Sequence, residues 1–338
     1  MGIPHVRFAV NSICGFKCSY CRAGGESSFL SSDVLSKDEV FAILSVLKAN
    51  GIRFVKFTGG DPLLRKDILE VLQEAYRLEI PHIELITNGT KVKEAVAARE
   101  IRNLTRLTVS LDTLRAERFR SLYQRDCFDA VKEGIIQAAQ TGIKVRINMV
   151  LMAFNVDELE AMIRFADSLK VELKVIELLE FQVPDRDFWV HNYIDPNEIV
   201  STIERYGAYT ASSWGEGDLG APMRVFQTPA ASKILIYESS PGTHFGSVCE
   251  GCEHYPCQDG LYGLRITHDG KLKTCWARND NLIDLLSPLR SGDMEEVGRR
   301  LRNVLNVFAN ADFREGYRPR FQLSNQFSPK LHQIDRAI

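Results

Sequence analysis

The sequence lacks an excess of charge of either sign, and it lacks any long hydrophobic run. Its 42 Lys and Arg residues nearly balance 44 Asp and Glu residues, so the basic surface typical of nucleic-acid-binding proteins is missing. No apolar run approaches the roughly 20 residues that a membrane-spanning helix needs, and the start of the chain does not resemble a signal peptide. These absences predict a cytoplasmic protein whose partners are neither nucleic acids nor membranes.

The chain does contain a regular alternation of β-rich runs and amphipathic helical patterns, from residue 5 to about residue 180. Strands are predicted at 5–11, 53–58, 82–88, 106–112, 144–150 and 172–179, and helices between them include 36–49, 67–78, 129–141 and 156–169. Six β/α units in this order require a parallel sheet with right-handed crossovers. Six units also favour an open partial barrel over a closed barrel of eight units.

The predicted fold class is therefore α/β, with a partial (β/α)6 TIM-type barrel over residues 1–215. The 338 residues are long enough for a second, smaller domain, which we place at 216–338. Residues 181–240 break the alternation, with two strand-like runs at 223–227 and 233–237. A final amphipathic helix is predicted at 294–308, and its apolar positions are expected to face the core.

Two neighbouring predicted strands alternate polar and apolar residues. Their polar faces hold Thr108, Ser110, Asp112, Lys144, Arg146 and Asn148. Helices must cover the apolar faces of a parallel sheet, so the polar faces are expected to line the barrel lumen, beside water or a polar ligand. A strand at the edge of the sheet would show the same alternation.

Eight cysteines in a reducing compartment are more readily explained as metal ligands than as disulfides. Cys14, Cys18 and Cys21 lie within eight residues, on a loop that follows the first predicted strand. Three thiolates can hold three irons of a four-iron cluster and leave the fourth iron open to a small molecule. The odd number argues against disulfides, and a zinc site normally has a fourth ligand close by.

A second group of cysteines precedes the last predicted helix. Its members are Cys249, Cys252, Cys257 and Cys275. A Cys-x2-Cys pair followed by a cysteine at the end of a hairpin is typical of iron–sulfur and of zinc sites, so zinc bound by four thiolates stays open as an alternative. The eighth cysteine, Cys127, is expected to be a packed core thiol.

Short polar or glycine-rich motifs end three of the predicted strands. Gly59 and Gly60 follow the second strand, and paired glycines let the backbone approach a ligand closely, although they also suit a tight turn. Asn88 ends the third strand and Ser110 the fourth. All of these lie at the carboxyl ends of strands, with the cysteine loop, and this is the end of a β/α barrel that carries the active site.

Together, the spacing Cys-x3-Cys-x2-Cys, the aromatic Tyr20 before the third cysteine and the Gly-Gly-Asp-Pro motif resemble the radical S-adenosylmethionine (SAM) superfamily. The resemblance implies a [4Fe-4S] cluster on the first three cysteines, with SAM on the open iron. It also implies reductive cleavage of SAM to a 5′-deoxyadenosyl radical, which removes hydrogen from a substrate. The electron would come from an external flavodoxin- or ferredoxin-type donor.

The same resemblance implies which residues contact SAM. The backbone of residues 59–62 would receive the methionine amino group, and Tyr20 would pack beside the adenine. Asp61 stands where the family more often has Glu. The full set of expected cofactor-binding residues is Tyr20, Gly59, Gly60, Asp61, Pro62, Asn88, Ser110 and Asn148.

Further stretches between residues 5 and about 305 resemble the GTP 3′,8-cyclases of molybdenum-cofactor biosynthesis, which carry an auxiliary [4Fe-4S] cluster in a SPASM/Twitch-type domain. One such stretch is Leu264-Arg-Ile-Thr-His-Asp-Gly-Lys-Leu-Lys-Thr-Cys275. By this resemblance Cys249, Cys252 and Cys275 hold the second cluster, while Cys257 lies in an apparent insertion. If Cys257 is a ligand, the cluster is closed; if it is not, one iron stays open.

Two departures from the cyclases favour a paralogue with a different substrate. The chain ends without their double glycine, and only Arg265 matches their arginine pair beside the auxiliary cysteines. We therefore predict a radical SAM enzyme that forms or rearranges C–C bonds in a small polar molecule, a nucleoside, nucleotide or nucleotide sugar, as in antibiotic or other specialised metabolism. The cations expected to meet an anionic substrate are Lys56, Lys144, Arg146, Arg224 and Arg265. The alternatives are the cyclase itself, a peptide-modifying maturase and a two-cluster electron carrier.

Overall fold

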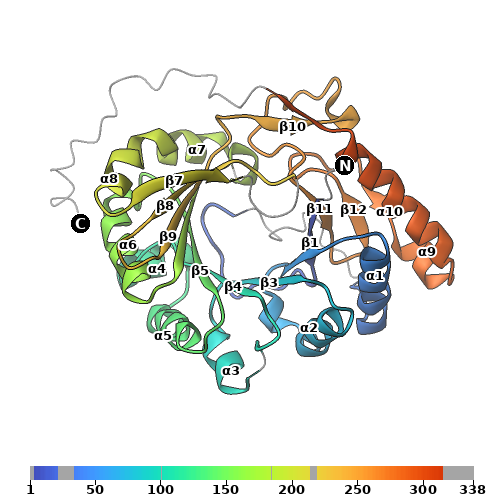
Figure 1. Ribbon diagram of the computed structural model, residues 1–338, viewed down its shortest axis with the longest axis horizontal. Coiled ribbons are helices and arrows are strands. Elements are labelled where there is room, and N and C mark those ends of the chain that lie inside the picture. The colour runs from blue at the N-terminus through green and yellow to red at the C-terminus, as the bar shows by residue number, and fades with distance from the viewer. Residues whose placement is uncertain (1–3, 22–33, 100, 184, 214–218, 315–338) are drawn as a thin grey trace.

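The computed structural model describes residues 4–21, 34–99, 101–183, 185–213 and 219–314. Six parallel strands form the centre of one curved sheet, and helices cover its outer face (Figure 1). The strands are β1 (His5–Ala9), β2 (Phe54–Thr58), β3 (His82–Thr87), β4 (Arg106–Ser110), β5 (Val145–Val150) and β6 (Glu172–Ile176). The helices between them are α1 (Lys37–Ala49), α2 (Ile68–Arg77), α3 (Val92–Ala97), α4 (Ala116–Tyr123), α5 (Phe128–Ala139) and α6 (Leu159–Ser168). The predicted alternation and the parallel sheet are confirmed.

The sheet continues past these six strands on both sides. On one side, β9 (Lys233–Tyr237) pairs in parallel with β6 and is followed by the antiparallel strands β8 (Met223–Gln227) and β7 (Ala208–Ser213). On the other side, β11 (Gly263–Ile266) pairs in parallel with β1, and β12 (Lys271–Lys273) and β13 (Ile283–Asp284) follow. The sheet therefore contains strands from both sides of the predicted boundary between 215 and 216, and the division into two domains there stays a prediction.

The polar faces of β4 and β5 lie in the lumen because neither strand is at an edge. β4 pairs with β3 and β5, and β5 pairs with β4 and β6. The apolar residues of these strands, including Leu107, Val109 and Ile147, are fully buried, as expected for a sheet face covered by helices. The alternative in which the polar residues face water at a sheet edge is wrong.

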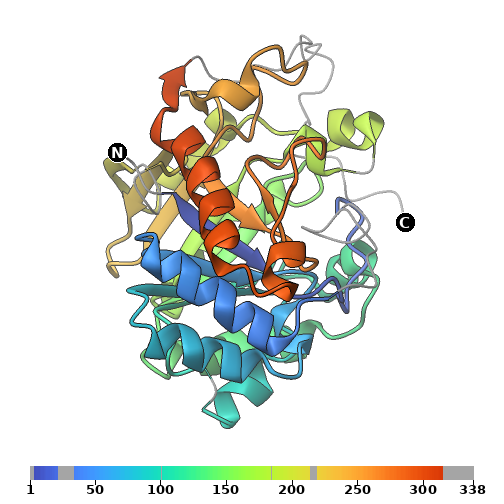
Figure 2. The same ribbon diagram turned by 90° about the vertical axis from the view of Figure 1, so that its right-hand side faces the viewer.

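Local sequence signals explain where the two long flanking helices begin. Ser36 and Glu39 form a capping box at the start of α1, a motif that stabilises a helix by about 1 kcal/mol. Asp293 caps α10 (Met294–Ala309), and the predicted core positions Val297, Leu301, Val304 and Phe308 are buried. The two helices pack side by side (Figure 2).

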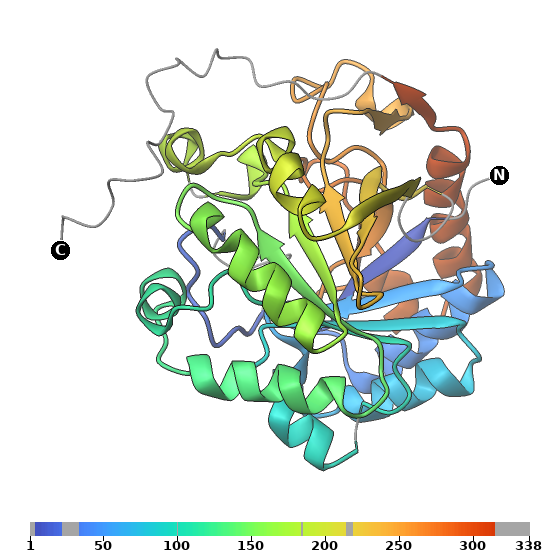
Figure 3. The same cartoon turned by 60° about the vertical axis from the view of Figure 1, so that its left-hand side comes forward.

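The remaining elements complete the rim of the molecule. They are the helices α7 (Arg186–Asn192), α8 (Val200–Glu204) and α9 (Leu286–Arg290), and the strand pair β10 (Thr243–Phe245) and β14 (Asp312–Arg314). Figure 3 shows the flank on which the green helices α5 and α6 cover the sheet. Among the described residues, no helix has the length and apolar character needed to cross a membrane. The chain end that departs from the cyclases lies outside the described residues.

Candidate active site

The first cysteine loop follows β1 and is fastened to the end of α4. The amide of Lys17 donates to the carbonyl of Tyr123, and the amide of Ser19 donates to the carbonyl of Leu122, both at 3.1 Å. Cys14 and Cys21 are exposed and Cys18 is half-buried. Burial raises the pKa of Cys18, and the nearby thiols of Cys21 and Cys14 act in the same direction. The structure therefore brings the three predicted ligands together.

The two glycines after β2 allow the backbone to pack against this loop. The amide of Gly60 donates to the carbonyl of Asn11 at 3.1 Å, and the amide of Asp61 donates to the carbonyl of Ile13 at 2.7 Å. A Cβ atom on Gly60 would lie 2.2 Å from the oxygen of Ile13, and one on Gly59 would lie 2.3 Å from the oxygen of Asn11. Glycine is thus required here to bring the end of β2 to the cysteine loop.

A cavity of about 600 Å³ opens between the cysteine loop and the carboxyl ends of the strands. The predicted site residues that line it are Cys14, Cys18, Cys21, Tyr20, Gly59, Gly60, Asn88 and Ser110. The side-chain nitrogen of Asn88 lies 3.7 Å from the sulfur of Cys14. Residues that the sequence suggested separately, on four different segments, therefore share one cavity.

Three other predicted cofactor contacts lie beside the cavity. The buried carboxylate of Asp61 accepts a hydrogen bond from the hydroxyl of Thr87 at 2.7 Å, and this bond links the ends of β2 and β3. Burial raises the pKa of Asp61. Pro62 is buried at the start of a 3-10 turn. Asn148 pairs in register with Ser110, and its buried side-chain oxygen accepts no hydrogen bond from the described residues. That oxygen is an acceptor that a ligand in the lumen could satisfy.

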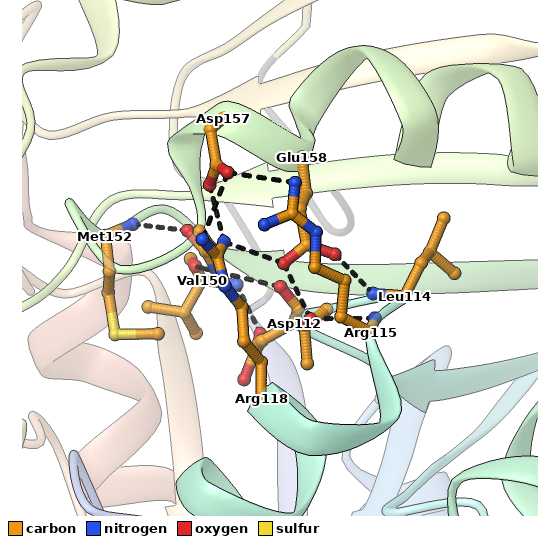
Figure 4. A network of polar contacts seen from close by, with 10 residues as sticks. Asp112, Leu114, Arg115, Arg118, Val150, Met152, Asp157 and Glu158 are labelled. Carbon is orange, nitrogen blue, oxygen red and sulfur yellow. Dashed lines mark hydrogen bonds and ion pairs between the residues drawn. The ribbon is translucent and has the colours of Figure 1, made fainter. Parts of the chain in front are cut away.

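Asp112, which Figure 4 shows close to Val150, lies just past β4 and supports the cavity without lining it. Its fully buried carboxylate accepts hydrogen bonds from the hydroxyls of Tyr20 and Tyr123, at 2.7 and 2.8 Å, and from the amide of Val150 at 2.7 Å. Burial raises the pKa of Asp112. Tyr20 is thus held in place by a polar group that also fixes the end of β5.

The loop after β4 is fixed by a second polar group in the same view (Figure 4). Glu158 accepts hydrogen bonds from the hydroxyl of Thr113 at 2.7 Å and from the amide of Leu114 at 2.8 Å. Arg118 of α4 joins this carboxylate to Asp157, with a 2.9 Å contact to Glu158. Because α4 also holds the cysteine loop, this group ties the loop to the body of the barrel.

Deeper in the lumen lies a network of buried charges. Lys56 lies 3.9 Å from Glu84, and Arg146 lies 2.7 Å from Glu172. Burial lowers the pKa of Lys56 to about 7. Although burial opposes its ionisation, the charges of Lys56 and Arg146 lower the pKa of Glu84 to about 2. Two of the predicted substrate-binding cations are therefore inside the barrel.

The sequence reasoning predicted Arg265 as a cation of the lumen but missed three further residues there, Arg7, Lys174 and Trp276. The guanidinium groups of Arg7 and Arg265 each lie 5.0 Å from the centre of the Trp276 ring, and Trp276 also lines the cavity. Lys174 lies 5.0 Å from the centre of the Tyr237 ring. Arg7 alternates with the apolar residues Val6 and Phe8 of β1, and Lys174 alternates with Leu173 and Val175 of β6, so this period of two could have identified them. No sequence signal marked Trp276, a single aromatic residue after a cysteine.

Two of the predicted substrate cations do not join this group. Lys144 is exposed and precedes β5, so it lies at the edge of the barrel opposite the first cysteine loop. Arg224 forms a 2.6 Å ion pair with Glu238. It shares the face of Ile236 and Val175, which is opposite to the face that carries Lys174. Spacing alone could not separate these two residues from the cations in the lumen.

The second cysteine group lies at the amino end of the β1–β11 pair, whereas the first cysteine loop follows the carboxyl end of β1. Cys249, Cys252 and Cys257 precede β11, and Cys275 follows β12, which returns antiparallel to β11. Burial raises the pKa values of Cys249 and Cys275, and raises that of Cys257 to about 12. The lumen with its buried cations therefore lies between two groups of cysteines.

Among the described residues, which include all eight cysteines, no three His, Cys, Asp or Glu side chains are grouped so that they could hold one metal ion. In an iron–sulfur cluster each thiolate binds its own iron, so the ligands need not converge on a single point. For the second cysteine group, a cluster and zinc bound by four thiolates therefore both stay predictions.

Comparisons with known proteins place the chain in a family. Residues 9–166 match the family model of the radical SAM superfamily. The chain is 30% identical over 309 residues to a protein of Pyrococcus abyssi named "Probable GTP 3',8-cyclase", covering 90% of this chain and 95% of that protein. It is 29% identical over 310 residues to the GTP 3',8-cyclase of Ectopseudomonas mendocina, covering 90% and 89%.

A solved structure has a similar fold. Streptococcus suis SuiB bound to S-adenosylmethionine superposes with a TM-score of 0.58 at 15% identity, covering 89% of this chain and 68% of SuiB. SuiB bound to its precursor peptide SuiA gives a TM-score of 0.57 at 16% identity, and there the chain spans 63% of the length of SuiB. At such identities the likeness concerns the fold alone.

Proposed function

Because the chain belongs to the radical SAM superfamily, we propose that it acts on a small anionic substrate bound in the cation-rich lumen, a nucleoside, nucleotide or nucleotide sugar. The chain is an enzyme of this superfamily, whose members use a four-iron cluster and SAM. The observation that carries the proposal is the set of buried cations between the two cysteine groups. Carbon–carbon bond formation or rearrangement is the proposed reaction class.

The cavity residues fit the two cofactors. Cys14, Cys18 and Cys21 supply three thiolates at its mouth, and no fourth cysteine lines it among the described residues. When bound, the cluster and SAM together supply a carbon radical that can remove a hydrogen atom from a substrate. We assign the methionine end of SAM to the backbone beside Gly59 and Gly60, and the adenine to the side of Tyr20.

The rest of the chain orients the ligands and excludes water. The hydrogen bonds to Asp112 hold Tyr20 at one wall, and Asn148 and Ser110 present polar atoms on adjacent strands. Neither SAM nor the substrate needs a protein group as general base in this chemistry, since the cofactors carry the difficult step. The task of the protein is therefore positioning and the exclusion of solvent.

The charge balance of the lumen supports an anionic substrate. Arg7, Lys56, Arg146, Lys174 and Arg265 outnumber the carboxylates that face them, which are Glu84, Glu172 and Asp259. Burial, together with nearby cations, lowers the pKa of Lys174. An excess of buried positive charge is costly without a counter-charge. A phosphate or carboxylate group of the substrate would supply it.

A second cluster on Cys249, Cys252 and Cys275, in a Twitch- or SPASM-like region, is part of the proposal, with Cys257 as a further candidate ligand. So is an external electron donor of the flavodoxin or ferredoxin type. Conversion of GTP by the enzyme as a true GTP 3′,8-cyclase is the second candidate, because curated relatives carry that name at 29–30% identity. The peptide-maturase alternative gains no support, since the likeness to SuiB shows the fold alone.

The test is anaerobic reconstitution with iron and sulfide, followed by incubation with SAM and dithionite. We expect 5′-deoxyadenosine, and we expect its yield to rise with the correct substrate in a panel of nucleosides, nucleotides and nucleotide sugars. Replacing Cys14, Cys18 and Cys21 by Ala should abolish the product. No 5′-deoxyadenosine from protein with intact clusters would overturn the proposal. Formation of the cyclised product from GTP would establish the second candidate.

A further inference from the structure

The segment that follows Cys257 is fixed to the interior of the fold at every residue. Gln258 donates to Glu177 at 2.8 Å, and Asp259 accepts from Arg265 at 2.7 Å and from the amide of Trp276. Gly260 has a φ of +66°, and a Cβ atom there would lie 1.9 Å from the hydroxyl of Thr243. The position of Cys257 is therefore set by packed elements, as expected of a metal ligand and not of a surface insertion.

The sulfur of Cys257 has a backbone donor of its own. The amide of Gly260 donates to this sulfur at 3.3 Å, as the amide of Phe16 donates to the sulfur of Cys14 at 3.4 Å. Hydrogen bonds to cysteine sulfurs are a recurrent feature of iron–sulfur sites, where they tune the reduction potential. Cys257 thus shares with a ligand of the first site a feature that suits a bound thiolate.

The four thiols of the second group are electrostatic neighbours of one another. Cys257 interacts with Cys275, Cys275 with Cys249, and Cys249 with Cys252. Hydrogen bonds join the segments that carry these thiols. Asp259, two residues after Cys257, accepts from the amide of Trp276, which follows Cys275, and Arg278 donates to the carbonyl of Val248, which precedes Cys249, at 2.6 Å.

Cys127 shows what a cysteine outside such a group looks like. It is half-buried at the start of α5, and the charged neighbours that affect its pKa are Arg125 and Asp126, with no other thiol among them. Partial burial alone therefore does not distinguish Cys257. The distinguishing features are the neighbouring thiols, the backbone donor and the fixed segment.

We propose that Cys257 is the fourth ligand of the second cluster, so that this cluster is closed and holds no substrate through an open iron. The inference rests on the second cluster of the proposed function. It implies that the substrate is held by side chains alone, among them Arg7, Arg265 and Trp276. The second centre is then an electron-transfer or structural site and not a Lewis acid.

The test isolates the second site by replacing Cys14, Cys18 and Cys21 with Ala, and uses ¹³C-cyanide as a small ligand for any open iron. After anaerobic reconstitution, we expect about four irons per chain and no ¹³C coupling in the electron paramagnetic resonance of the reduced protein. Adding Cys257→Ala should change the spectrum and create a ¹³C coupling. Adding Cys127→Ala, the matched control, should change neither.

Three results would overturn the inference. They are a ¹³C coupling while Cys257 is present, an unchanged spectrum without coupling in Cys257→Ala, and absence of iron from the triple-alanine protein. The proposed function is tested by a separate measurement, because it fails if the parent enzyme forms no 5′-deoxyadenosine.

A second measurement covers the case in which Cys257→Ala binds no iron at all. Alkylation of the parent holoenzyme, followed by mass spectrometry, should label Cys127 and leave Cys257 unlabelled. Removing the iron with a chelator should make Cys257 reactive. Labelling of Cys257 in the iron-loaded protein would contradict its role as a ligand.

Discussion

Lys56 carries a charge that changes near neutral pH, and this gives the lumen a pH-dependent affinity for anions. Burial lowers its pKa to about 7, so its proton is lost as the pH rises through that value. A bound anion favours the protonated form. We expect the affinity for GTP, used as an anionic probe, to fall up to about tenfold between pH 6 and pH 8, as measured by calorimetric titration.

Two variants make this prediction specific. Lys56→Arg keeps the positive charge over the whole range and should flatten the profile. Lys144→Ala removes an exposed lysine at the far edge of the barrel and should leave the profile as it is in the parent. If Lys56→Arg retains the full pH dependence, the titrating group is another residue.

Asp112 is the second residue whose removal has a clear consequence. Asp112→Ala leaves two buried tyrosine hydroxyls and the amide of Val150 without their acceptor. We expect the free energy of unfolding to fall by about 3–5 kcal/mol, since each unsatisfied buried group costs about 1–3 kcal/mol. Tyr20→Phe removes one of these bonds and should cost about 1 kcal/mol. Urea denaturation measures both, and equal losses would argue against the shared acceptor.

Sequence reasoning at the residue scale found the groups that have a motif around them. The cysteine loop, the two glycines and Asn88 were identified because their spacing after a strand is itself informative. Trp276 and Asp112 take their roles from contacts with segments that are distant in the sequence. The hydrogen bond between Tyr20 and Asp112, for example, joins residues that are 92 positions apart. A pattern of neighbouring residues cannot predict such contacts.

At the scale of elements, the end of β2 and the loop after β1 function as one unit. Gly60→Ala would place a carbon 2.2 Å from the carbonyl oxygen of Ile13 and push the two segments apart. We expect a loss of about 1–3 kcal/mol in the free energy of unfolding and a lower iron content at the first site. Denaturation and iron analysis of the reconstituted protein test this.

Gly15→Ala is the matched control for this variant. It lies in the same loop, and its added carbon would come no closer than 3.9 Å to another group, the side chain of Asn88. Its stability should stay within about 0.5 kcal/mol of the parent. A similar loss of iron in both variants would mean that the loop tolerates no substitution, and the close approach at Gly60 would not be the cause.

The positions of individual strands could be predicted better than their neighbours in the sheet. The runs at 223–227 and 233–237 were recognised as strands from their apolar content, and β8 and β9 occupy these residues. That β9 continues the parallel sheet beside β6 did not follow from the sequence. Pairing depends on contacts between distant segments, whereas strand propensity is local.

At the scale of the whole molecule, the barrel core depends on strands from the C-terminal third of the chain. Residues 1–215 contain β1 and β6 but not β11 and β9, which pair with them. A fragment of residues 1–215 would expose two unpaired edges, and such edges promote aggregation. We expect the fragment to be insoluble or unfolded, and the full chain to unfold in one transition.

Circular dichroism and sedimentation of the two proteins test this expectation. A soluble fragment that unfolds cooperatively would show that residues 1–215 are an independent domain. The sequence suggested such a division because the β/α alternation stops near residue 180. The strands that complete the sheet come later in the chain, where the sequence shows no β/α alternation that would predict them.

The parallel pair of β1 and β11 aligns Arg7 with Arg265. The first cysteine loop leaves the carboxyl end of this pair, and the second cysteine group lies at its amino end. The paired strands therefore fix the separation of the two cysteine groups. Enzymes with this scaffold would acquire new substrates by exchanging the side chains that lie between the two cysteine groups. The length available to a bound molecule between these groups would stay constant.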